Sequence, residues 1–565
     1  MSAAQQPAAS NSQELSQMTQ RFAPIEMKVD ISGLSSGDKQ ALVKLVQAAR
    51  IVNHLFMQQF WSGDLALYEK LQKDKTVLGQ ARLHYFWINK GPWSEIDGHT
   101  AFLPDVTKKK PVGANFYPED MTKEEFESWT RTLSGGEKEQ AEGFFTVVRR
   151  DANHKLKLVP YSQEYRSDLD RAATLLREAA ALTDNATLKK FLTTRASAFS
   201  SNDYYESDVA WMDLDAPVDV TIGPYETYND EIFGYKAGFE AYVNVRDEKE
   251  SARLAFLGQN LQQIEDNLPE DPQYRVAKLG ALAPIRVVNE VYAAGDGSHG
   301  VQTAAYNLPN DDKVVQLKGS KRVMLKNVQE AKFKATLLPI SRVVLSPAAQ
   351  KDLSFDLFFM HIVAQHIVAH ELTHGLGPQR IQISGRETNP RLELKDLYSA
   401  IEEAKADVTG LFAVQFLMTQ ADNGPDSLPD SLKTQAPLAH GPDAERRLYT
   451  TYLASSFRTL RFGLQDAHAR GMAIQFNYFL DKGAYIAHAD GTFSVDLSKI
   501  KDAVRSLDHE FLTLEATGDY AGAKKMIEQM GVVRPEVQKA LDRLKSVPTD
   551  IEPVFVTADS LSPYR

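Results

Sequence analysis

The sequence of 565 residues contains no cysteine. Without thiols the chain can form no disulfide, no iron–sulfur cluster and no Cys-ligated zinc site, and it has no thiol nucleophile. The sequence also lacks any apolar run that approaches the roughly 18 residues needed to span a bilayer, so we expect no membrane association. Any metal ligand or nucleophile must therefore come from other side chains.

A secretory signal is missing as well, because the start MSAAQQPAASNSQELSQ has no basic region followed by an apolar one. As it stands, the sequence fits a cytoplasmic protein. A polar leader rich in Ala, Ser and Gln is also what remains after a signal peptide is removed, which would place the protein in the periplasm or outside the cell. Both interpretations stay open, and the sequence predicts no oligomeric state.

The sequence has fewer basic than acidic residues. It contains 64 Lys and Arg residues and 75 Asp and Glu residues, which gives a net charge of −11. No block of Lys and Arg is long enough to follow a phosphate backbone, so we expect no nucleic-acid partner. An acidic protein suits cationic or neutral substrates. The 43% hydrophobic and 25% charged residues are typical of a globular protein.

The order of helical and β-rich segments predicts two lobes. The first third of the sequence reads mainly helical. Alternating apolar and polar residues then predict strands at 239–245 and 285–292, and a third β-rich stretch at 334–345. Helical patterns occupy 247–283 and 347–544, so we interpret 247–283 as an insertion into the second lobe.

The strongest motif is His370-Glu-Leu-Thr-His374, which lies late in an apolar run and is followed by glycine. Residues four apart share a helix face, so His370 and His374 can both reach one Zn²⁺ while Glu371 faces the bound water. The bare pattern also recurs by chance in long sequences. Its position at the end of a predicted buried helix favours the metal interpretation.

A third protein ligand is expected from the next predicted helix, which contains Glu402, Glu403 and Asp407. One carboxylate of the Glu pair can bind the metal, and the other acids can hydrogen-bond the histidines. A solvated first helical turn is the alternative interpretation, because acids are also favoured there. The spacing does not choose between the two glutamates.

A glycine motif also stands out, because residues 295–300 (GDGSHG) match the GxGxxG spacing of dinucleotide-binding loops. The residues that follow, VQTAAYNLP, have no helical pattern, although a phosphate site of this kind requires a helix there. We therefore predict a glycine turn at this position.

The predicted zinc-site residues, together with three further blocks of sequence, resemble the dipeptidyl peptidase III family of zinc metallopeptidases. The blocks occur in the family's order between residues 222 and 468. They are IGPYETYND (222–230) with GFEAYVNV (238–245), NLPNDD (307–312), HELTH (370–374) with EEAKAD (402–407), and DAH (466–468).

The resemblance implies a role for each matching residue. One Zn²⁺ per chain would be held by His370, His374 and Glu403, with Glu402 and Asp407 supporting the histidines. Glu371 would be the general base, and His468 would donate to the developing oxyanion. The peptide would be aligned by Asn307 and Asn310 through its main chain, and its free ammonium would be held by Asp219 and Glu226.

The sequence departs from the family pattern at three points. The family's usual zinc helix has one more residue between its histidines. Thr221 stands where better-known members carry an active-site tyrosine, and Met472 stands where a substrate-binding arginine is expected. The zinc chemistry therefore transfers to this chain more directly than the substrate specificity.

The resemblance implies an α+β fold with two lobes and an active-site cleft between them. A mostly helical lobe would bind zinc, and the other would combine a small β-barrel with helices. The predicted segments are a flexible tail (1–24), the barrel lobe (25–246 and 284–346), the zinc lobe (247–283 and 347–544), and a return to the barrel lobe (545–565).

The predicted function is a zinc-dependent metallopeptidase that hydrolyses short peptides and releases N-terminal dipeptides. Thr221 and Met472 motivate an alternative, a zinc oligopeptidase or another zinc hydrolase with a different small substrate. A non-catalytic peptide-binding protein is the other alternative, although binding alone does not need Glu371.

Overall fold

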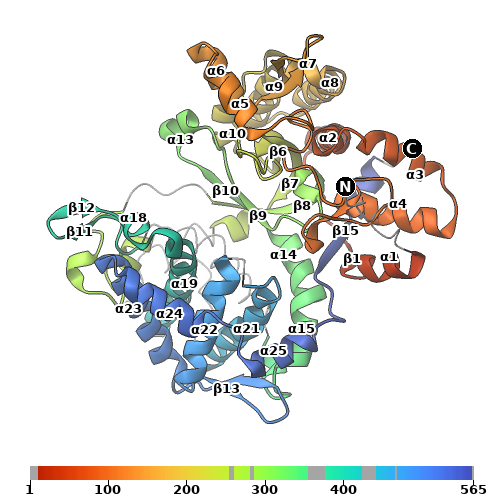
Figure 1. Ribbon diagram of the computed structural model, residues 1–565. Helices are drawn as coiled ribbons and strands as arrows, with labels where there is room; N and C mark the ends of the chain where they lie inside the picture. Colours follow the sequence, from red (N-terminus) through yellow and green to blue (C-terminus); the bar gives the residue numbers. More distant parts are fainter. Residues whose placement is uncertain are drawn as a thin grey trace, which may run out of the picture. The chain divides into compact units, whose positions relative to one another are not determined.

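The computed structural model describes residues 11–252, 260–279, 285–353, 355, 376–422, 441–464 and 467–562. The chain divides into two compact units, each assembled from separate stretches of sequence. Unit 1 comprises Met1–Asp247, Val288–Val328 and Asp550–Arg565, and unit 2 comprises Glu248–Val287 and Gln329–Thr549. Both units are described below by their own contacts (Figure 1).

Unit 1 is built on a five-stranded sheet with the order β6-β7-β8-β10-β9. The strands are β6 (Val218–Glu226), β7 (Gly238–Arg246), β8 (Ile285–Gly295), β9 (Ala305–Leu308) and β10 (Lys321–Leu325). Strands β6/β7, β7/β8 and β10/β9 pair in antiparallel fashion. Within the described residues β6 and β9 are edge strands, so the sheet is open and the predicted closed barrel is wrong.

The described strands do not close into a barrel because the stretch 334–345, which was predicted to be β-rich, is helical instead. It forms the π-turn η4 (Phe333–Leu337) and helix α15 (Leu338–Val344). Leu337, Ile340 and Val344 are fully buried, at a spacing that matches one face of a helix. Burial along that face outweighs the β propensity of the Val and Ile residues.

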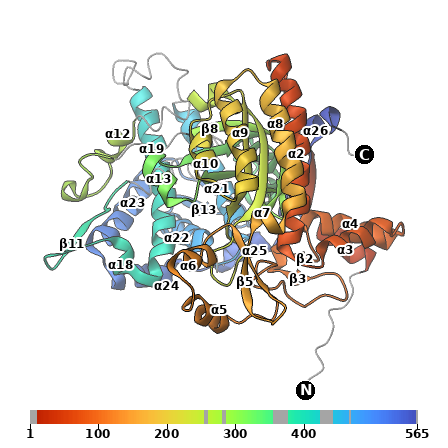
Figure 2. The ribbon, with the colours of Figure 1, turned by 90° about the horizontal axis from the view of Figure 1, so that it is seen from above.

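Three long helices cover one face of this sheet, namely α2 (Ser36–Phe60), α8 (Arg166–Leu182) and α9 (Ala186–Ser201). They lie side by side in Figure 2, where α2 contacts α8 and α8 contacts α9. Helix α2 is capped by Ser35, whose side chain accepts a hydrogen bond from the Asp38 N–H. The helix buries an apolar stripe along one face. Contacts of α2 with β7 and of α9 with β6 fix these helices on the sheet.

Alternation along the strands separates an apolar face from a polar one. Phe239 packs on Phe199 of α9 with ring centroids 6.3 Å apart, so its face of β7 is the one that the helices cover. Glu240 and Tyr242 therefore point to the opposite face. Their register partners on β6 are Gly223 and Thr221.

The amino-terminal segment corrects the predicted flexible tail. Helix α1 (Ser12–Thr19) starts at Asn11, whose side chain accepts a hydrogen bond from the backbone of Glu14, and buries Leu15 completely. Strand β1 (Phe22–Glu26) then pairs in parallel with β15 (Asp550–Val554). The polar composition of this segment did not indicate that one leucine is buried, or that a strand near the other end of the chain pairs with it.

Smaller elements complete unit 1. The helices are α3 (Asp64–Lys73), α4 (Val77–Asn89), α5 (Lys123–Thr130), α6 (Gly135–Ala141), α7 (Tyr161–Glu164), α10 (Tyr205–Met212), α13 (Asp312–Lys318) and α26 (Val556–Leu561). The hairpins are β2 (Trp93–Ser94) with β3 (Thr100–Ala101), and β4 (Thr146–Arg150) with β5 (Leu156–Pro160).

Unit 2 is mainly helical and is centred on α19 (Tyr398–Asp422), which packs against α22 (Ala467–Asp481) and α23 (Ile500–Thr517). The other helices are α12 (Leu261–Glu265), α14 (Lys326–Lys332), which enters from unit 1, α18 (Pro390–Leu394), α21 (Pro442–Leu460), α24 (Tyr520–Met530) and α25 (Pro535–Asp542). The hairpins are β11 (Ile381–Ile383) with β12 (Arg386–Thr388), and β13 (Tyr485–Ala487) with β14 (Phe493–Val495).

No helix in the described part of the chain has both the length and the hydropathy of a membrane span.

Candidate functional site

The predicted zinc helix with His370, Glu371 and His374 lies outside the described residues. Within the residues that the structure describes, no three His, Asp or Glu side chains form a group that could hold a metal ion. The geometry of the site is therefore built from helix α19, its neighbours in unit 2, and the sheet of unit 1.

Glu402 of α19 is held by a buried lysine. Lys405 lies one turn further along the helix, and its Nζ is 2.9 Å from Glu402 Oε1 and 3.7 Å from Glu515 Oε2 on α23. Burial lowers the pKa of Lys405, but the two carboxylates outweigh it and raise that pKa above its usual value. The lysine therefore stays charged and fixes the carboxylate of Glu402.

The same lysine anchors the chain just after the predicted zinc helix. Lys405 Nζ donates to the carbonyl oxygen of Leu376 at 3.3 Å, and the N–H of Gly377 donates to Glu265 Oε2 at 2.9 Å. Gly377 has φ +74°, a left-handed conformation that favours glycine. The sequence HELTHGLG thus ends in a turn that two buried side chains hold in place.

Glu403, the neighbour of Glu402, contacts a different partner. Its Oε2 is 3.1 Å from Nδ1 of His468, in the first turn of α22. Helix α22 comes close to α19 at Gly471, where a Cβ atom would be 3.1 Å from the Cβ of Ala404. This close approach allows an imidazole and a carboxylate from distant parts of the sequence to meet.

Asp407, one turn after Glu403, is 1% exposed. Its Oδ2 accepts a hydrogen bond from Gln475 Nε2 at 3.2 Å, and Gln475 Oε1 accepts one from the hydroxyl of Tyr452. A carboxylate at this depth keeps its orientation because its neighbours are packed and hydrogen-bonded.

The polar face of the unit 1 sheet carries a second group of acids. Asp219 on β6 is 0% exposed, and neither of its carboxylate oxygens has a hydrogen-bond partner within the described residues. Its register partner Asn244 on β7 is also buried, and its side-chain amide likewise lacks a partner there. Buried polar groups without partners are costly, and a ligand can satisfy them.

Three carboxyl groups meet near the end of this face. Burial raises the pKa of Glu226 to about 7, and the charge of Asp296 adds to the increase. Burial also raises the pKa of Asp296 to about 6, although the amide of Asn229, which donates to Oδ1 at 2.9 Å, opposes this. The pKa of Glu240 lies well above its usual value because of burial and then of the two neighbouring acids.

The predicted glycine turn positions Asp296. Gly295 has φ +66°, and a Cβ there would be 2.2 Å from the carbonyl oxygen of Phe239. At Gly297 a Cβ would be 2.5 Å from the ring of Tyr242. Glycines on both sides therefore allow the turn after β8 to lie directly on β7, which brings Asp296 toward Glu240.

The two predicted peptide-binding asparagines lie on and just after β9, an edge strand. Asn307 is exposed, opposite Arg322 of β10. Asn310 is beyond the strand end, and its Nδ2 donates to the carbonyl oxygen of Tyr225 at 2.9 Å. Only one side of β9 is paired within the described residues.

The two positions that depart from the family pattern are both buried. The Oγ1 of Thr221 accepts a hydrogen bond from Trp211 Nε1 at 3.1 Å and lies 2.9 Å from the hydroxyl of Tyr306. Met472 is 0% exposed within α22. Both side chains are therefore packed in the interior of the protein.

Sequence reasoning missed several residues of these two groups. In unit 2 they are Lys405, Glu515, Gln475 and Glu265, and in unit 1 they are Glu240, Asn244 and Asp296. A polar residue at alternate positions of an apolar strand was a usable signal for Glu240 and Asn244. No local pattern indicated Glu515 or Gln475, which reach α19 only through helix packing.

Comparisons with known proteins agree with these motifs. A model of peptidase family M49 matches residues 133–384. Nudix hydrolase 3 of Arabidopsis thaliana is 41% identical over 97% of this chain and 74% of its own length. Human dipeptidyl peptidase 3 is 24% identical over 57% of this chain and 47% of its own length.

Two solved structures match almost the whole chain. Dipeptidyl-peptidase III from Corallococcus sp. strain EGB is 51% identical, with a TM-score of 0.78, over 98% of this chain and 99% of its own. DPP III from Caldithrix abyssi is 42% identical, with a TM-score of 0.89, over 97% of this chain and 100% of its own. The name of the plant relative differs, but these matches leave almost nothing of either peptidase structure uncovered. This chain therefore belongs to peptidase family M49, the family of the dipeptidyl-peptidase III enzymes.

Proposed function

We propose that this protein is a zinc metallopeptidase that releases dipeptides from the free N-terminus of short peptides. The observation that carries the proposal is the different environment of two adjacent glutamates on α19. Glu402 is held by Lys405, whereas Glu403 lies beside His468. Glu403 thus lies beside an imidazole of the described part of the chain, as a metal site with nearby catalytic residues requires.

Zinc fits the donors that this chain offers. Two imidazoles four residues apart and one carboxylate are a frequent set of three protein ligands for catalytic Zn²⁺. We assign these roles to His370, His374 and Glu403, with one ion per chain. Glu402 and Asp407 would orient the histidines, because metal-binding imidazoles commonly donate their second N–H to a carboxylate. A bound zinc ion would polarise the substrate carbonyl and lower the pKa of a water molecule.

The chain's own residues then move the protons. Glu371 would accept a proton from the attacking water and deliver it to the leaving amine nitrogen. His468 would donate a hydrogen bond to the oxyanion that develops on the scissile carbonyl. Its contact with Glu403 supports this role, because His468 Nδ1 lies 3.1 Å from Oε2 of the glutamate that we assign to the metal.

Edge strand β9 is suited to bind the peptide main chain. An extended peptide can add to a strand that is paired on one side only, and Asn307 and Asn310 lie at the end of that strand. The proposal requires one peptide to reach both these asparagines and the zinc residues of unit 2. The active-site cleft expected for the family would provide such a path.

The acids of the unit 1 sheet would hold the substrate's ammonium group. We assign this role to Glu226, with Glu240 and Asp296 as its neighbours. Asp219, the other acid predicted for this role, lies seven residues away along β6, a distance of roughly 20 Å at about 3.3 Å per residue, which is too far for both to contact one ammonium group. Buried carboxyl groups without a cation gain most from a positively charged ligand, because the ligand removes the cost of their burial. Recognition of the ammonium would set the distance from the N-terminus at which the chain is cut.

The alternative is a zinc oligopeptidase, or another zinc hydrolase, that lacks this N-terminal recognition. Thr221 and Met472 motivate it, because neither supplies the tyrosine or the arginine expected for the family. A non-catalytic peptide-binding protein is the second alternative.

Products released from tetrapeptides to octapeptides test the proposal. Purified protein should contain one zinc per chain and release only the first two residues, as identified by mass spectrometry. Removal of zinc by a chelator should stop cleavage, and added Zn²⁺ should restore it. Internal cuts at varied distances from the N-terminus would favour the oligopeptidase, and binding without any cleavage by the zinc-loaded protein would favour the non-catalytic protein.

A further inference from the structure

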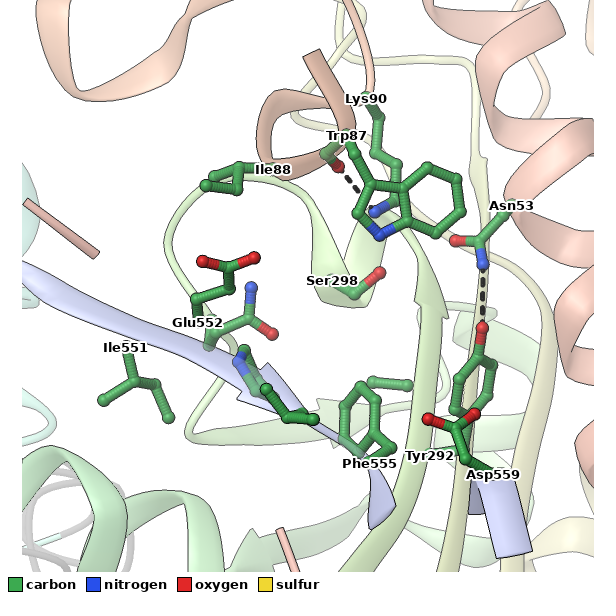
Figure 3. Close-up of a pocket in the computed structure, with 14 residues that line it drawn as sticks. Asn53, Trp87, Ile88, Lys90, Tyr292, Ser298, Ile551, Glu552, Phe555 and Asp559 are labelled. Atoms are coloured by element: carbon green, nitrogen blue, oxygen red, sulfur yellow. Dashed lines mark hydrogen bonds between the residues drawn. The ribbon is translucent and has the colours of Figure 1, made fainter. Parts of the chain in front are cut away.

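A pocket in unit 1 lies apart from every residue assigned above (Figure 3). It has a volume of about 190 Å³ and lies among α2, α4, the end of β8, and β15 with the segment that follows it. Trp87, Ile551 and Phe555 give it apolar walls, and Lys90 and Ser298 are polar groups at its lining. A space of this size suits a small organic molecule with an apolar body.

Lys90 is an unusual residue for such a lining. It is 3% exposed and ends helix α4 with φ 49°, a left-handed conformation that is uncommon for a residue with a side chain. Its Nζ donates to the carbonyl oxygen of Trp87 at 2.8 Å and lies 4.0 Å from the centre of the Trp87 ring. Figure 3 shows the ammonium nitrogen beside that indole, at the pocket.

Both acids that line the pocket already have a basic partner. Glu552 Oε1 is 2.6 Å from His84 Nε2, and Asp559 Oδ1 is 2.9 Å from Arg50 NH2. Lys90 makes no ion pair within the described part of the chain, and its remaining N–H donors have no acceptor there. An unpaired buried ammonium group is costly, so the pocket lacks one negative charge.

We propose that this pocket binds a small organic monocarboxylate whose carboxylate pairs with Lys90 and whose apolar body packs on Trp87 and Phe555. A single negative charge matches a single unpaired lysine. A phosphate would carry its second charge toward Glu552 and Asp559, so a monocarboxylate is the better fit. The hydroxyl of Ser298, which donates to the carbonyl oxygen of Gly295 at 3.4 Å, also lines the pocket.

The protonation of Lys90 gives the site a pH signature. Burial lowers the pKa of Lys90 to about 7, and the charge of Glu552 only partly opposes this. A carboxylate binds the protonated amine, so affinity should fall about 30-fold from about pH 6 to about pH 8.5, as the protonated fraction of a group with this pKa does. Proton uptake on binding should accompany it near neutral pH.

Within the described residues, the charged or titratable groups around Lys90 are those of Glu552, Asp559, Arg50, His84, His299 and Tyr292. Burial holds the pKa of His299 well below its usual value, so this ring is neutral. The hydrogen bond with Glu552 raises the pKa of His84 above its usual value, so this ring needs a separate control.

Isothermal titration calorimetry of the full chain with phenylacetate tests the proposal. Wild-type protein should bind phenylacetate, should bind neutral phenylacetamide at least about 10-fold more weakly, and should show the loss of affinity with pH. Lys90→Met should lose at least about 10-fold in affinity at about pH 6 and all of the proton uptake. His84→Gln should keep both the binding and the proton uptake.

Lys75→Met is the matched control, because exposed Lys75 also donates to a carbonyl oxygen three residues back, that of Gln72. It should bind as wild type does. Lys90→Met should melt at or above the wild-type temperature, since it removes an unpaired buried charge, so weak binding cannot be blamed on unfolding. Equal binding by Lys90→Met and wild type, or an affinity that is flat with pH, would overturn the proposal. So would an absence of binding to wild-type protein at about pH 6 by phenylacetate and by 4-methylvalerate.

Discussion

The acids of helix α19 and the acids of the unit 1 sheet differ in the partners that surround their carboxyl groups. On α19 each carboxylate has a specific partner, as Glu402 has Lys405 and Glu403 has His468. On the sheet, Asp219 has no hydrogen-bond partner within the described residues, and Glu226 lies among other acids. The first arrangement fixes the direction of each carboxylate, and the second leaves a deficit of positive charge.

This difference corresponds to two tasks. A metal site needs carboxylates that are already oriented, because the geometry of the ligands decides the affinity and the reactivity of the ion. A site for a substrate ammonium needs carboxylates that gain from its arrival. The comparison therefore predicts that substitutions on α19 act through the metal, whereas substitutions on the sheet act through recognition of the N-terminus.

The largest effect is expected at Glu403. Glu403→Ala should lose zinc and with it all peptidase activity, since a ligand is removed. Glu402→Ala should keep zinc and lose about 10- to 100-fold in affinity or activity, because only a supporting interaction is lost. Competition with a chelator, followed by metal analysis, measures both variants. If Glu402→Ala lost zinc more readily than Glu403→Ala did, the assignment of the ligand would be reversed.

The next effect concerns the general base. Glu371→Gln should retain zinc, because Glu371 is not assigned as a ligand, and should lower turnover by at least about 10². Zinc content and kcat measured on the same sample check both parts. Turnover close to that of the wild type would exclude the proposed mechanism while leaving the zinc site intact.

On the sheet we expect a smaller and more selective effect. Glu240→Gln removes a carboxyl group that could pair with the substrate ammonium beside Glu226, and it should raise KM for peptides with a free N-terminus by about 10-fold, with kcat and zinc content little changed. Glu119→Gln, at an exposed acid of unit 1 that hydrogen-bonds Trp61 and Ser62, is the control. A fall in zinc content for Glu240→Gln would contradict the separation of the two groups of acids.

The smallest effect is a pH dependence that the same acids confer. With pKa values of about 7 for Glu226 and about 6 for Asp296, these groups become charged only as the pH rises through that range. The kcat/KM for free peptides should therefore increase from about pH 5.5 to 7.5, and Glu226→Gln should flatten this rise. A rise of the same steepness in the variant would mean that other groups set the profile.

Protein stability should change with pH in the opposite direction. Because the folded-state pKa of Glu226 is raised, the folded chain keeps this proton to higher pH than the unfolded chain does. The resulting contribution to stability is complete below about pH 4.5 and declines up to about pH 7. The difference in Tm between Glu226→Gln and wild type should therefore grow in favour of the variant over this range.

The two regions also differ in how far the sequence predicted them. Glu402, Glu403 and Asp407 are close together in sequence on one helix, so their grouping followed from periodicity and resemblance. Lys405 lies inside the same motif, yet its role depends on Glu515 of another helix, which no spacing reveals. Local patterns indicate which residues share an element, and packing decides which elements meet.

The sheet acids show the same limit more strongly. Asp219 and Glu226 came from the resemblance, but Glu240 and Asp296 join them only through strand register and a turn that two glycines permit. The predicted strands 239–245 and 285–292 are confirmed, whereas the prediction of a β-rich stretch at 334–345 is wrong, because its β-branched residues also fit a buried helix face. The predicted zinc pair lies outside the described residues, so it stays a prediction.

The central claim is that unpaired acids on the sheet select a free N-terminus for a zinc site elsewhere in the chain. Matched free and N-acetylated peptides, digested by the wild-type enzyme and analysed by mass spectrometry, test this claim directly. We predict release of the first two residues from the free peptides and almost no cleavage of the acetylated ones, because acetylation removes the charge and leaves the carboxylates unpaired. Equal cleavage of both sets, or cuts at varied distances from the N-terminus, would contradict the account.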